Sequence, residues 1–400
     1  MATNLDISQL EGKSAHDDLY IVGDSDGSSA VDFKFVVDLF ANNKQLIRAK
    51  IFPDPTNSKC YFNISNIVSN EMKFDWFEPN GQVFIKQLDN SGQIYLPVEV
   101  RLGTDVSGIT TLNLASGSVT VANTIPNLFK RQRTILDNSV KQFYTNRDKL
   151  NIQSNYDEDL YVGCAIANES EILRVQQYNS AGTFLASGNI AVPTPTTTNI
   201  FQLNISPDAL IDAGITFNAN CAYYEVQIRN FALTVIDFVR VYFKCKTRYT
   251  PINLHFMNVY GLFDTGRFDC VSKLSMNKQK KSYETIDAKF FNTVRFYDDL
   301  ATTKYTNYQY YESNINFGSQ YDWSYKLTMD FPNDQDYQWL SELIMSPQVW
   351  AEIIVSPGQK EYYAVSIKAN NYEYSKHINN GLRAFEVEID MNQKRNGFRR

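Results

Sequence analysis

The segment VDFKFVVDLFANNKQLIRAKIF, from Val31 to Phe52, contains two stretches with the pattern of β-strands around a short turn. In the first stretch, apolar residues at positions 33, 35, 37 and 39 alternate with Lys34 and Asp38, which is typical of a strand with one buried face. Asn42-Asn43 supplies the turn, and two prolines follow the returning stretch and end it. We therefore predict an antiparallel hairpin over residues 33–52.

The same alternation recurs along the chain, as in QIYLPVEVRL (residues 93–102) and SVTVAN (residues 118–123). The composition agrees, because 26 Phe and 25 Tyr among 400 residues favour strands over helices. Hydrophobic residues make up 43% and charged residues 20%, which is enough for a packed core. We predict a mainly β protein built from tandem antiparallel β-sandwich or barrel domains, with one helix in a β-rich C-terminal domain.

The length and the changes in composition divide the chain into five parts. We expect a flexible N-terminal arm (residues 1–30), a first β-sandwich (31–125), a basic connector (126–156), a second β-sandwich (157–248) and a C-terminal β-rich domain (249–400). The helix is expected near residues 334–346, because Asn333-Asp334 is a good N-terminal cap and Pro347 ends the apolar periodicity. The chain ends in a basic tail.

Two short segments hint at a duplication. FNISNIV (residues 62–68) and LNISPDALI (residues 203–211) share an apolar-Asn-Ile-Ser core after an expected strand. Ser65 and Ser206 are placed to cap a helical turn there. The second sandwich is therefore a candidate repeat of the first, although one shared tetrapeptide can also be coincidence.

Charged segments are candidates for contacts between subunits. The connector is basic. The last strand alternates apolar residues with acidic ones, so the solvent-exposed face of this strand could contact a basic partner. A solvated charge run is an equally good interpretation of the connector. The residues singled out as possible inter-subunit contacts are Lys130, Arg131, Arg133, Glu386, Glu388, Arg399 and Arg400.

Several functional classes find little support. The net charge of −6 argues against a nucleic-acid-binding protein. The first twenty residues lack the pattern of a signal peptide, and the most apolar stretch, residues 231–243, contains Asp237 and Arg240, so no membrane insertion is expected. The five cysteines are far apart and lack metal-ligand spacing, so we interpret them as small buried hydrophobes and predict no metal and no cofactor.

Catalytic signals are weak. The chain has three histidines and none of the common nucleophile, phosphate-loop or zinc motifs. Paired carboxylates of a glycan hydrolase remain possible, since such an enzyme needs two carboxyls roughly 5–10 Å apart. The candidates on spacing are Asp330, Asp334 and Asp336, and Asp264 with Asp269, but negative charge at 334 and 336 is also expected where a helix begins. We predict no enzyme activity.

A glycan-binding surface is the stronger alternative. Tyr308, Tyr310 and Tyr311 could present aromatic rings to a sugar. Packing between tyrosines on neighbouring strands is the simpler interpretation of the same pattern.

The segment LHFMNVYGLFDTGRFD, from Leu254 to Asp269, has the residue types of an active site. Its periodicity instead indicates a strand, a turn shaped by Asn258 and Gly261, and a return, at the corner between the second and third domains. We expect Asp264 to bond to turn backbone, and His255 to lie on the polar side of the strand without an evident partner.

The segment from Tyr242 to Glu284 contains a recognisable pattern at the corner, whose positions are Phe256, Asn258, Gly261, Phe263, Asp264 and Phe268. Similar features extend over the C-terminal third, through Asp322-Trp323, the helix ending in Met345-Ser346-Pro347 and the basic end. On these residues the chain resembles virion structural proteins, of tail or head–tail connector type, from tailed phages that infect Bacteroidetes, including crAss-like phages. The chain departs from the pattern at residues 265–267.

This resemblance implies assembly and no enzymatic turnover. The expected protein is a structural component of a virion tail, tail hub or head–tail connector. Its expected partners are further copies of itself, in a ring of about six or twelve, and other virion proteins, with no specific nucleic-acid recognition. The alternative is a receptor- or glycan-binding β-sandwich protein of the same tail, with a glycan hydrolase as the third choice.

Overall fold

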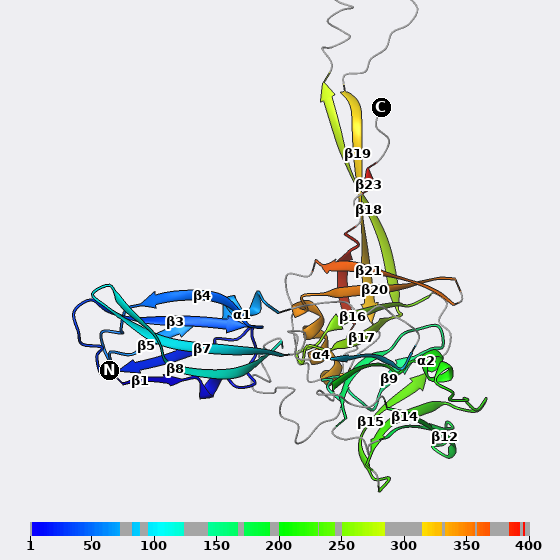
Figure 1. Ribbon diagram of the computed structural model, residues 1–400. Helices are drawn as coiled ribbons and strands as arrows, with labels where there is room; N and C mark the ends of the chain where they lie inside the picture. Colours follow the sequence, from blue (N-terminus) through cyan, green and yellow to red (C-terminus); the bar gives the residue numbers. More distant parts are fainter. Residues whose placement is uncertain are drawn as a thin grey trace, which may run out of the picture.

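The computed structural model describes residues 2–72, 82–88, 95–123, 143–166, 172–192, 200–230, 232–244, 250–284, 314–329, 333–356, 358–368, 384–392 and 395–396. The chain is mainly β, and its sheets are built almost entirely from antiparallel pairs (Figure 1). Two sandwiches precede a C-terminal unit with one large sheet. The predicted fold class is confirmed.

The first sandwich is built on the predicted hairpin. Strand β3 (Phe33–Ala41) and strand β4 (Lys44–Ile51) flank Asn42 and Asn43, which both have positive φ, as a two-residue hairpin turn requires. Asp38 was expected on a wet face, but it is buried and accepts two hydrogen bonds from the Arg48 guanidinium. Strands β7 (Tyr95–Val106) and β8 (Ile109–Ala122) complete a four-stranded layer in the order β4-β3-β7-β8.

The second layer of this sandwich contains the residues expected to form a flexible arm. Strands β1 (Thr3–Asp6), β2 (Tyr20–Ser25) and β5 (Cys60–Asn63) pair in that order. A 3₁₀ turn (Ser8–Leu10) and helix α1 (Ser65–Ser69) accompany them. Leu10, Leu19 and Ile21 enter the same core as Phe35 and Val100 of the opposite layer. Residues 3–25 are thus part of the domain, and the prediction of an arm over residues 1–30 was wrong.

The second sandwich repeats this plan. Its larger layer has the order β12-β11-β14-β15-β9, and its smaller layer the order β10-β13-β6. Strand β6 comes from the segment assigned to the first domain, and β9 comes from the segment assigned to the connector. The predicted boundaries at residues 125 and 156 therefore do not separate the two sandwiches. The elements are β6 (Phe84–Leu88), β9 (Ile152–Ser154), β10 (Tyr161–Ala165), β11 (Ile172–Tyr178), β12 (Phe184–Ile190), β13 (Ile200–Asn204), α2 (Pro207–Asp212), β14 (Tyr223–Arg229) and β15 (Val235–Phe243).

The two sandwiches match in topology and in register. The orders β4-β3-β7-β8 and β12-β11-β14-β15 follow the chain in the same sequence, and β2 pairs β5 as β10 pairs β13. Tyr20 lies opposite Asn63, as Tyr161 lies opposite Asn204. These correspondences support the interpretation that one sandwich was duplicated.

The shared Asn-Ile-Ser turn has the same hydrogen bonds in both copies. The Oδ1 atom of Asn63 accepts from the backbone N–H groups of Leu19 and Ser65. That of Asn204 accepts from Leu160 and Ser206. The Ser206 hydroxyl caps α2 as predicted, but the N-cap of α1 is Ile64 and Ser65 caps nothing.

The C-terminal unit is an antiparallel sheet with α4 against it. Its order is β17-β16-β20-β21-β22-β19-β18, and β23 pairs with β19. Helix α4 (Asp334–Met345) begins at the Asn333 cap, as predicted, and buries Trp339 and Leu343. The strands are β16 (Ile252–Met257), β17 (Phe263–Phe268), β18 (Val271–Glu284), β19 (Asn314–Met329), β20 (Val349–Ser356), β21 (Gln359–Ile367), β22 (Phe385–Asp390) and β23 (Arg395–Asn396).

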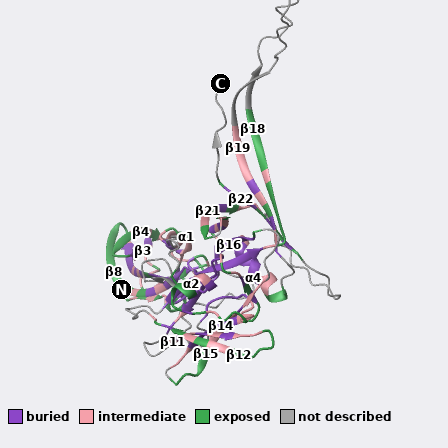
Figure 2. Cartoon of the chain, turned by 90° about the vertical axis from the view of Figure 1, so that its right-hand side faces the viewer, coloured by how far each residue is buried: buried purple, intermediate pink, exposed green. Residues whose placement is uncertain are grey.

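Strands β18 and β19 extend beyond this sheet. They pair along their whole length and leave the body of the protein as a two-stranded ribbon (Figure 1). The described side chains of β18 are mostly exposed, in contrast to the buried strands of the body (Figure 2). We call β18 and β19 together the ribbon.

Candidate functional site

The corner segment at residues 254–269 lies where the second sandwich meets the C-terminal unit. It forms β16, a tight turn and β17, as its periodicity predicted. The Asn258 side chain accepts from the backbone N–H groups of Tyr260 and Leu262, and Gly261 has a positive φ of 79°. The predicted turn roles of Asn258 and Gly261 are confirmed.

Asp264 has a different role from the one expected. It lies within β17 and is buried, and its Oδ2 accepts from the Thr145 hydroxyl (2.7 Å) and from the Trp339 indole N–H (2.8 Å). Burial raises the pKa of Asp264 to about 6, although these hydrogen bonds act in the opposite direction. Asp264 therefore joins the segment before β9 to α4, and the prediction that it bonds to turn backbone was wrong.

His255 is also buried and fully partnered. Its ring nitrogens lie 3.0 Å from the Thr265 hydroxyl and 3.0 Å from a carboxylate oxygen of Glu352 on β20. The Tyr161 ring of the second sandwich packs edge-on against it, with 4.6 Å between centroids. The expected polar side of β16 is thus covered by the second sandwich.

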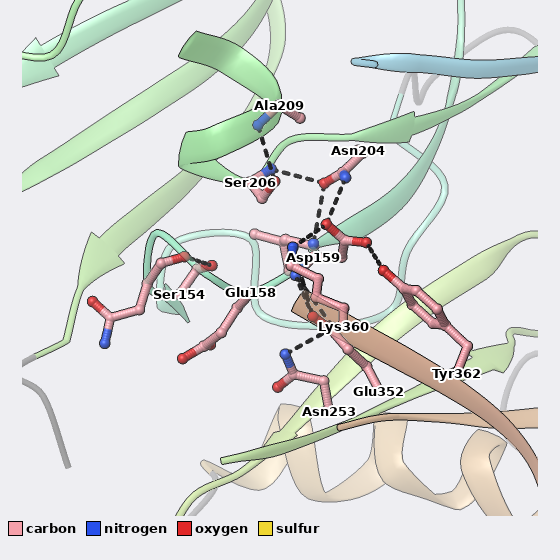
Figure 3. Close-up of polar contacts among 12 residues, drawn as sticks. Ser154, Glu158, Asp159, Asn204, Ser206, Ala209, Asn253, Glu352, Lys360 and Tyr362 are labelled. Carbon is pink, nitrogen blue, oxygen red and sulfur yellow. Dashed lines mark hydrogen bonds and ion pairs between the residues drawn. The ribbon is translucent and has the colours of Figure 1, made fainter. Parts of the chain in front are cut away.

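A cluster of charges surrounds Asp159, in the loop before β10 (Figure 3). Asp159 accepts hydrogen bonds from Asn204, from the Tyr362 hydroxyl and from the Lys360 ammonium, which lies 2.8 Å away. Burial alone would raise the pKa of Asp159, but Lys360 and the Tyr362 hydroxyl lower it to about 2. Glu352 lies beneath this cluster and accepts from the Asp159 backbone N–H.

A second ion-pair group binds the same two units. The Arg267 guanidinium on β17 donates two hydrogen bonds to Glu158, at 2.7 and 2.9 Å, and also contacts Asp269. Lys244, after β15, lies 2.5 Å from Asp269. Burial raises the pKa of Glu158, and the Arg267 charge offsets this only in part.

Asn146 and Arg147, in the segment before β9, contact α4. Asn146 donates to Glu342 at 2.6 Å, and Glu342 accepts a further hydrogen bond from the Val259 backbone N–H. The Arg147 guanidinium donates to the Thr265 carbonyl and lies over the Trp339 ring. Part of the expected connector is therefore buried structure.

An apolar patch completes the contact. One buried cluster contains residues of both units together with Tyr95 at the start of β7 in the first sandwich. The other members are Tyr144, Tyr161, Ile200, Val259, Tyr260, Leu262 and Phe263. Gly163 on β10 allows the close approach, because a Cβ atom there would lie 2.1 Å from a Leu262 methyl carbon. We call this whole region, polar and apolar, the junction.

The polar side chains of the junction hold the two units together. Its carboxylates each meet a cation or several hydrogen-bond donors, and most of the side chains are nearly inaccessible. Among the described residues, no group of three or more His, Cys, Asp or Glu side chains is arranged to hold a metal ion. No helix in the described part of the chain is long and apolar enough to cross a membrane.

Of the other candidate carboxylates, Asp336 and Asp269 are engaged, and Asp334 is exposed in the first turn of α4. Asp336 accepts from the Asp148 backbone N–H, and burial raises its pKa. Asp269 is held by two cations, as described above. Asp330 and the tyrosines at 308, 310 and 311 lie outside the described residues.

The residues predicted at subunit contacts fall into two groups. Glu386 and Glu388 lie on the exposed face of β22, as the alternation predicted, and they pair within the chain with Lys326 (2.6 Å) and Lys368 (3.3 Å). Their role between subunits stays a prediction. The remaining five lie outside the described residues, namely Lys130, Arg131, Arg133, Arg399 and Arg400.

The cysteines agree only in part with the expectation of buried hydrophobes. Cys60 and Cys164 are buried, and burial raises the pKa of Cys60 to about 12. Cys221 is half-buried, whereas Cys270 is exposed, so the expectation was wrong for Cys270. Cys245 lies outside the described residues.

The sequence reasoning missed the residues that complete the junction from a distance. Asp159 is 193 positions from Glu352 and 201 from Lys360, and no local spacing connects it with them. The one available signal was Glu352, which lies between apolar residues in β20, whereas Lys360 lies between Gln359 and Glu361 in β21.

Comparisons with known proteins add little. No protein-family model matches the chain, and no curated protein matches it. Among solved structures, the collagen adhesin (CNA) from S. aureus aligns with 66% of this chain and 93% of its own, at 10% identity and a TM-score of 0.12. A likeness this small carries no argument about fold or function.

Proposed function

We propose that this protein is a non-enzymatic structural component of a bacteriophage virion, which assembles as an oligomeric ring in the tail, the tail hub or the head–tail connector. The observation that carries the proposal is the junction. Residue types that could perform chemistry are used there to hold two β-rich units in one fixed relation. A subunit that must keep its shape under load needs such a joint.

The sequence resemblance supports the same function. The positions that carry it fall at the junction, where Phe256 and Phe268 pack in the C-terminal core and Asn258 and Asp264 bond to the segment before β9. The pattern is therefore tied to the joint between units. The net charge of −6 also suits a channel wall along which DNA slides without sticking.

Electron microscopy of the purified full-length chain in negative stain tests the proposal. We expect closed rings of about six or twelve copies. Single particles that bind host surface polysaccharide would instead favour the receptor-binding alternative. Release of reducing sugar that is abolished by Asp334→Asn and Asp336→Asn would favour a hydrolase.

A further inference from the structure

The duplicated sandwiches differ at one sheet edge. In the second sandwich, the outer edge of β13 is occupied by β6, which comes from the distant segment between α1 and β7. The Asn204 backbone N–H donates to the Val83 carbonyl there, at 2.8 Å. This edge of the sandwich therefore accepts a strand that is not its neighbour in sequence.

The equivalent edge of the first sandwich is open among the described residues. Strand β5 ends the order β1-β2-β5. The Ile64 N–H donates inward to the Leu19 carbonyl, so the alternation of an antiparallel pair turns the backbone groups of Tyr61 and Asn63 outward. Tyr61 is 44% exposed. Open backbone groups at a sheet edge are a template for strand addition.

The ribbon provides a strand with a free edge. Strand β18 ends its own sheet and pairs only with β19 among the described strands. Val271, Leu274 and Met276 on it are between 48% and 59% exposed. A two-stranded ribbon is marginally stable alone in water, so contact with a partner would stabilise it.

The lysines of β18 indicate which kind of partner this strand would bind. Strand β18 has lysines at 273, 278, 280 and 281, and no acidic partner of Lys273 or Lys280 lies among the described residues. Residues 2–32 supply β2, which pairs with β5, and β1 on the far side of β2, and they carry seven carboxylates and a single lysine. Lys59, directly before β5, lies 4.0 Å from Asp24 of β2. Lysines on an edge strand oppose pairing between two copies of β18, but they favour an acidic edge.

We propose that β18 of one copy of this chain adds to the open edge of β5 in a neighbouring copy. In Figure 1 the ribbon points upward and the first sandwich extends to the left, so β18 and β5 lie on different parts of the surface. Contact between them is therefore head-to-tail, and it closes into a ring when the rotation permits. The inference rests on the proposed function, which supplies the neighbouring copies, and adds the surfaces through which they meet.

Disulfide trapping between two full-length variants tests the pairing. Tyr61→Cys protein is mixed with Met276→Cys protein, both with Cys270→Ser to remove the exposed native thiol. We expect a cross-linked dimer in the mixture and none with either variant alone. The control replaces Tyr61→Cys by Phe184→Cys, since Phe184 is similarly exposed at 51% but lies on β12. Equal yields with the control, or no cross-link, would overturn the proposal.

Charge reversal gives a second readout. We expect the triple variant Lys273→Glu, Lys278→Glu, Lys280→Glu to self-associate at least about tenfold more weakly. A tenfold change corresponds to about 1.4 kcal/mol in binding free energy. Mixing with Asp24→Lys/Asp26→Lys protein should restore association. If the triple variant instead loses binding to duplex DNA and keeps its self-association, the ribbon is a nucleic-acid contact and the proposal is wrong.

The two proposals fail differently. Rings that form without the Tyr61–Met276 cross-link would reject the β18–β5 contact and leave the proposed function standing. A chain that neither cross-links nor associates would reject both.

Discussion

Glu158 of the second sandwich and Arg267 of the C-terminal unit form a two-point ion pair inside the junction, with side chains only 4% and 5% exposed. Removal of one member of a buried pair leaves the other charge without compensation. The pair therefore makes the folding of each unit depend on the other.

We expect Arg267→Ala to lower the free energy of unfolding by about 3–5 kcal/mol, because Glu158 then stays buried and unpaired. Arg267→Lys should recover only part of this, since an ammonium cannot make the two-point contact. Urea denaturation measures both. The control is Lys326→Ala, whose partner Glu386 is 52% exposed and whose loss should cost about 0–1 kcal/mol. Similar losses at the two sites would contradict the role of the junction.

Gly163→Ala tests the close approach of the two units. The new methyl group would overlap the Leu262 side chain, which is fully buried and cannot swing into solvent. We expect a loss of about 1–3 kcal/mol from overpacking. Gly266→Ala is the matched control, since its nearest neighbour would lie 3.5 Å away, an ordinary contact. Thermal melting that ranks the two variants in the opposite order would show that the approach is not tight.

The raised pKa of Asp264 implies that the stability of the protein depends on pH in a particular way. Burial raises its pKa to about 6 from 3.8, so the folded chain binds this proton more tightly than the unfolded chain does. Stability from this group is then greatest below about pH 4 and is lost as the pH rises to about 6.

The variant Asp264→Asn keeps an oxygen for Thr145 and Trp339 but cannot titrate. We expect the fall in unfolding free energy between about pH 4 and 6 to be smaller in this variant by about 3 kcal/mol. Parallel urea denaturation of both proteins across this range removes the contributions of the other groups. Identical pH profiles would refute the assignment.

The two Asn-Ile-Ser turns, which have matching hydrogen bonds, allow a paired comparison. Asn204 is buried, and Asn204→Ala would leave the Leu160 and Ser206 N–H groups without their acceptor, at a cost of about 1–3 kcal/mol. Asn63 makes the equivalent bonds but is more exposed, so water can replace part of them. We expect a smaller loss for Asn63→Ala in urea denaturation. A larger loss for Asn63→Ala than for Asn204→Ala would contradict this account, in which the two asparagines have the same role and the buried one is the more costly to remove.

Local signals account for the parts of the fold that could be predicted. The hairpin with Asn42-Asn43, the capped helix α4 and the alternation of β22 each depend on residues that are neighbours in sequence. The same holds for Asn258 and Gly261, whose turn is closed by residues within four positions.

The junction could not be predicted in this way. A period of two identifies the two faces of β16, but it does not say that a second unit covers the polar one. His255 finds Glu352 ninety-seven positions away, and Asp264 finds Thr145 at a separation of 119. The first two strands were missed for a related reason, because β1 and β2 are short and Ile21 is the one large apolar residue that they bury.

The mass of the purified full-length chain, measured by light scattering over a range of protein concentrations, tests the central claim most directly. The account predicts a species with the mass of a closed ring, about six or twelve chains, that dissociates when the lysines of β18 are reversed in charge. A species with the mass of one chain at every concentration would contradict it.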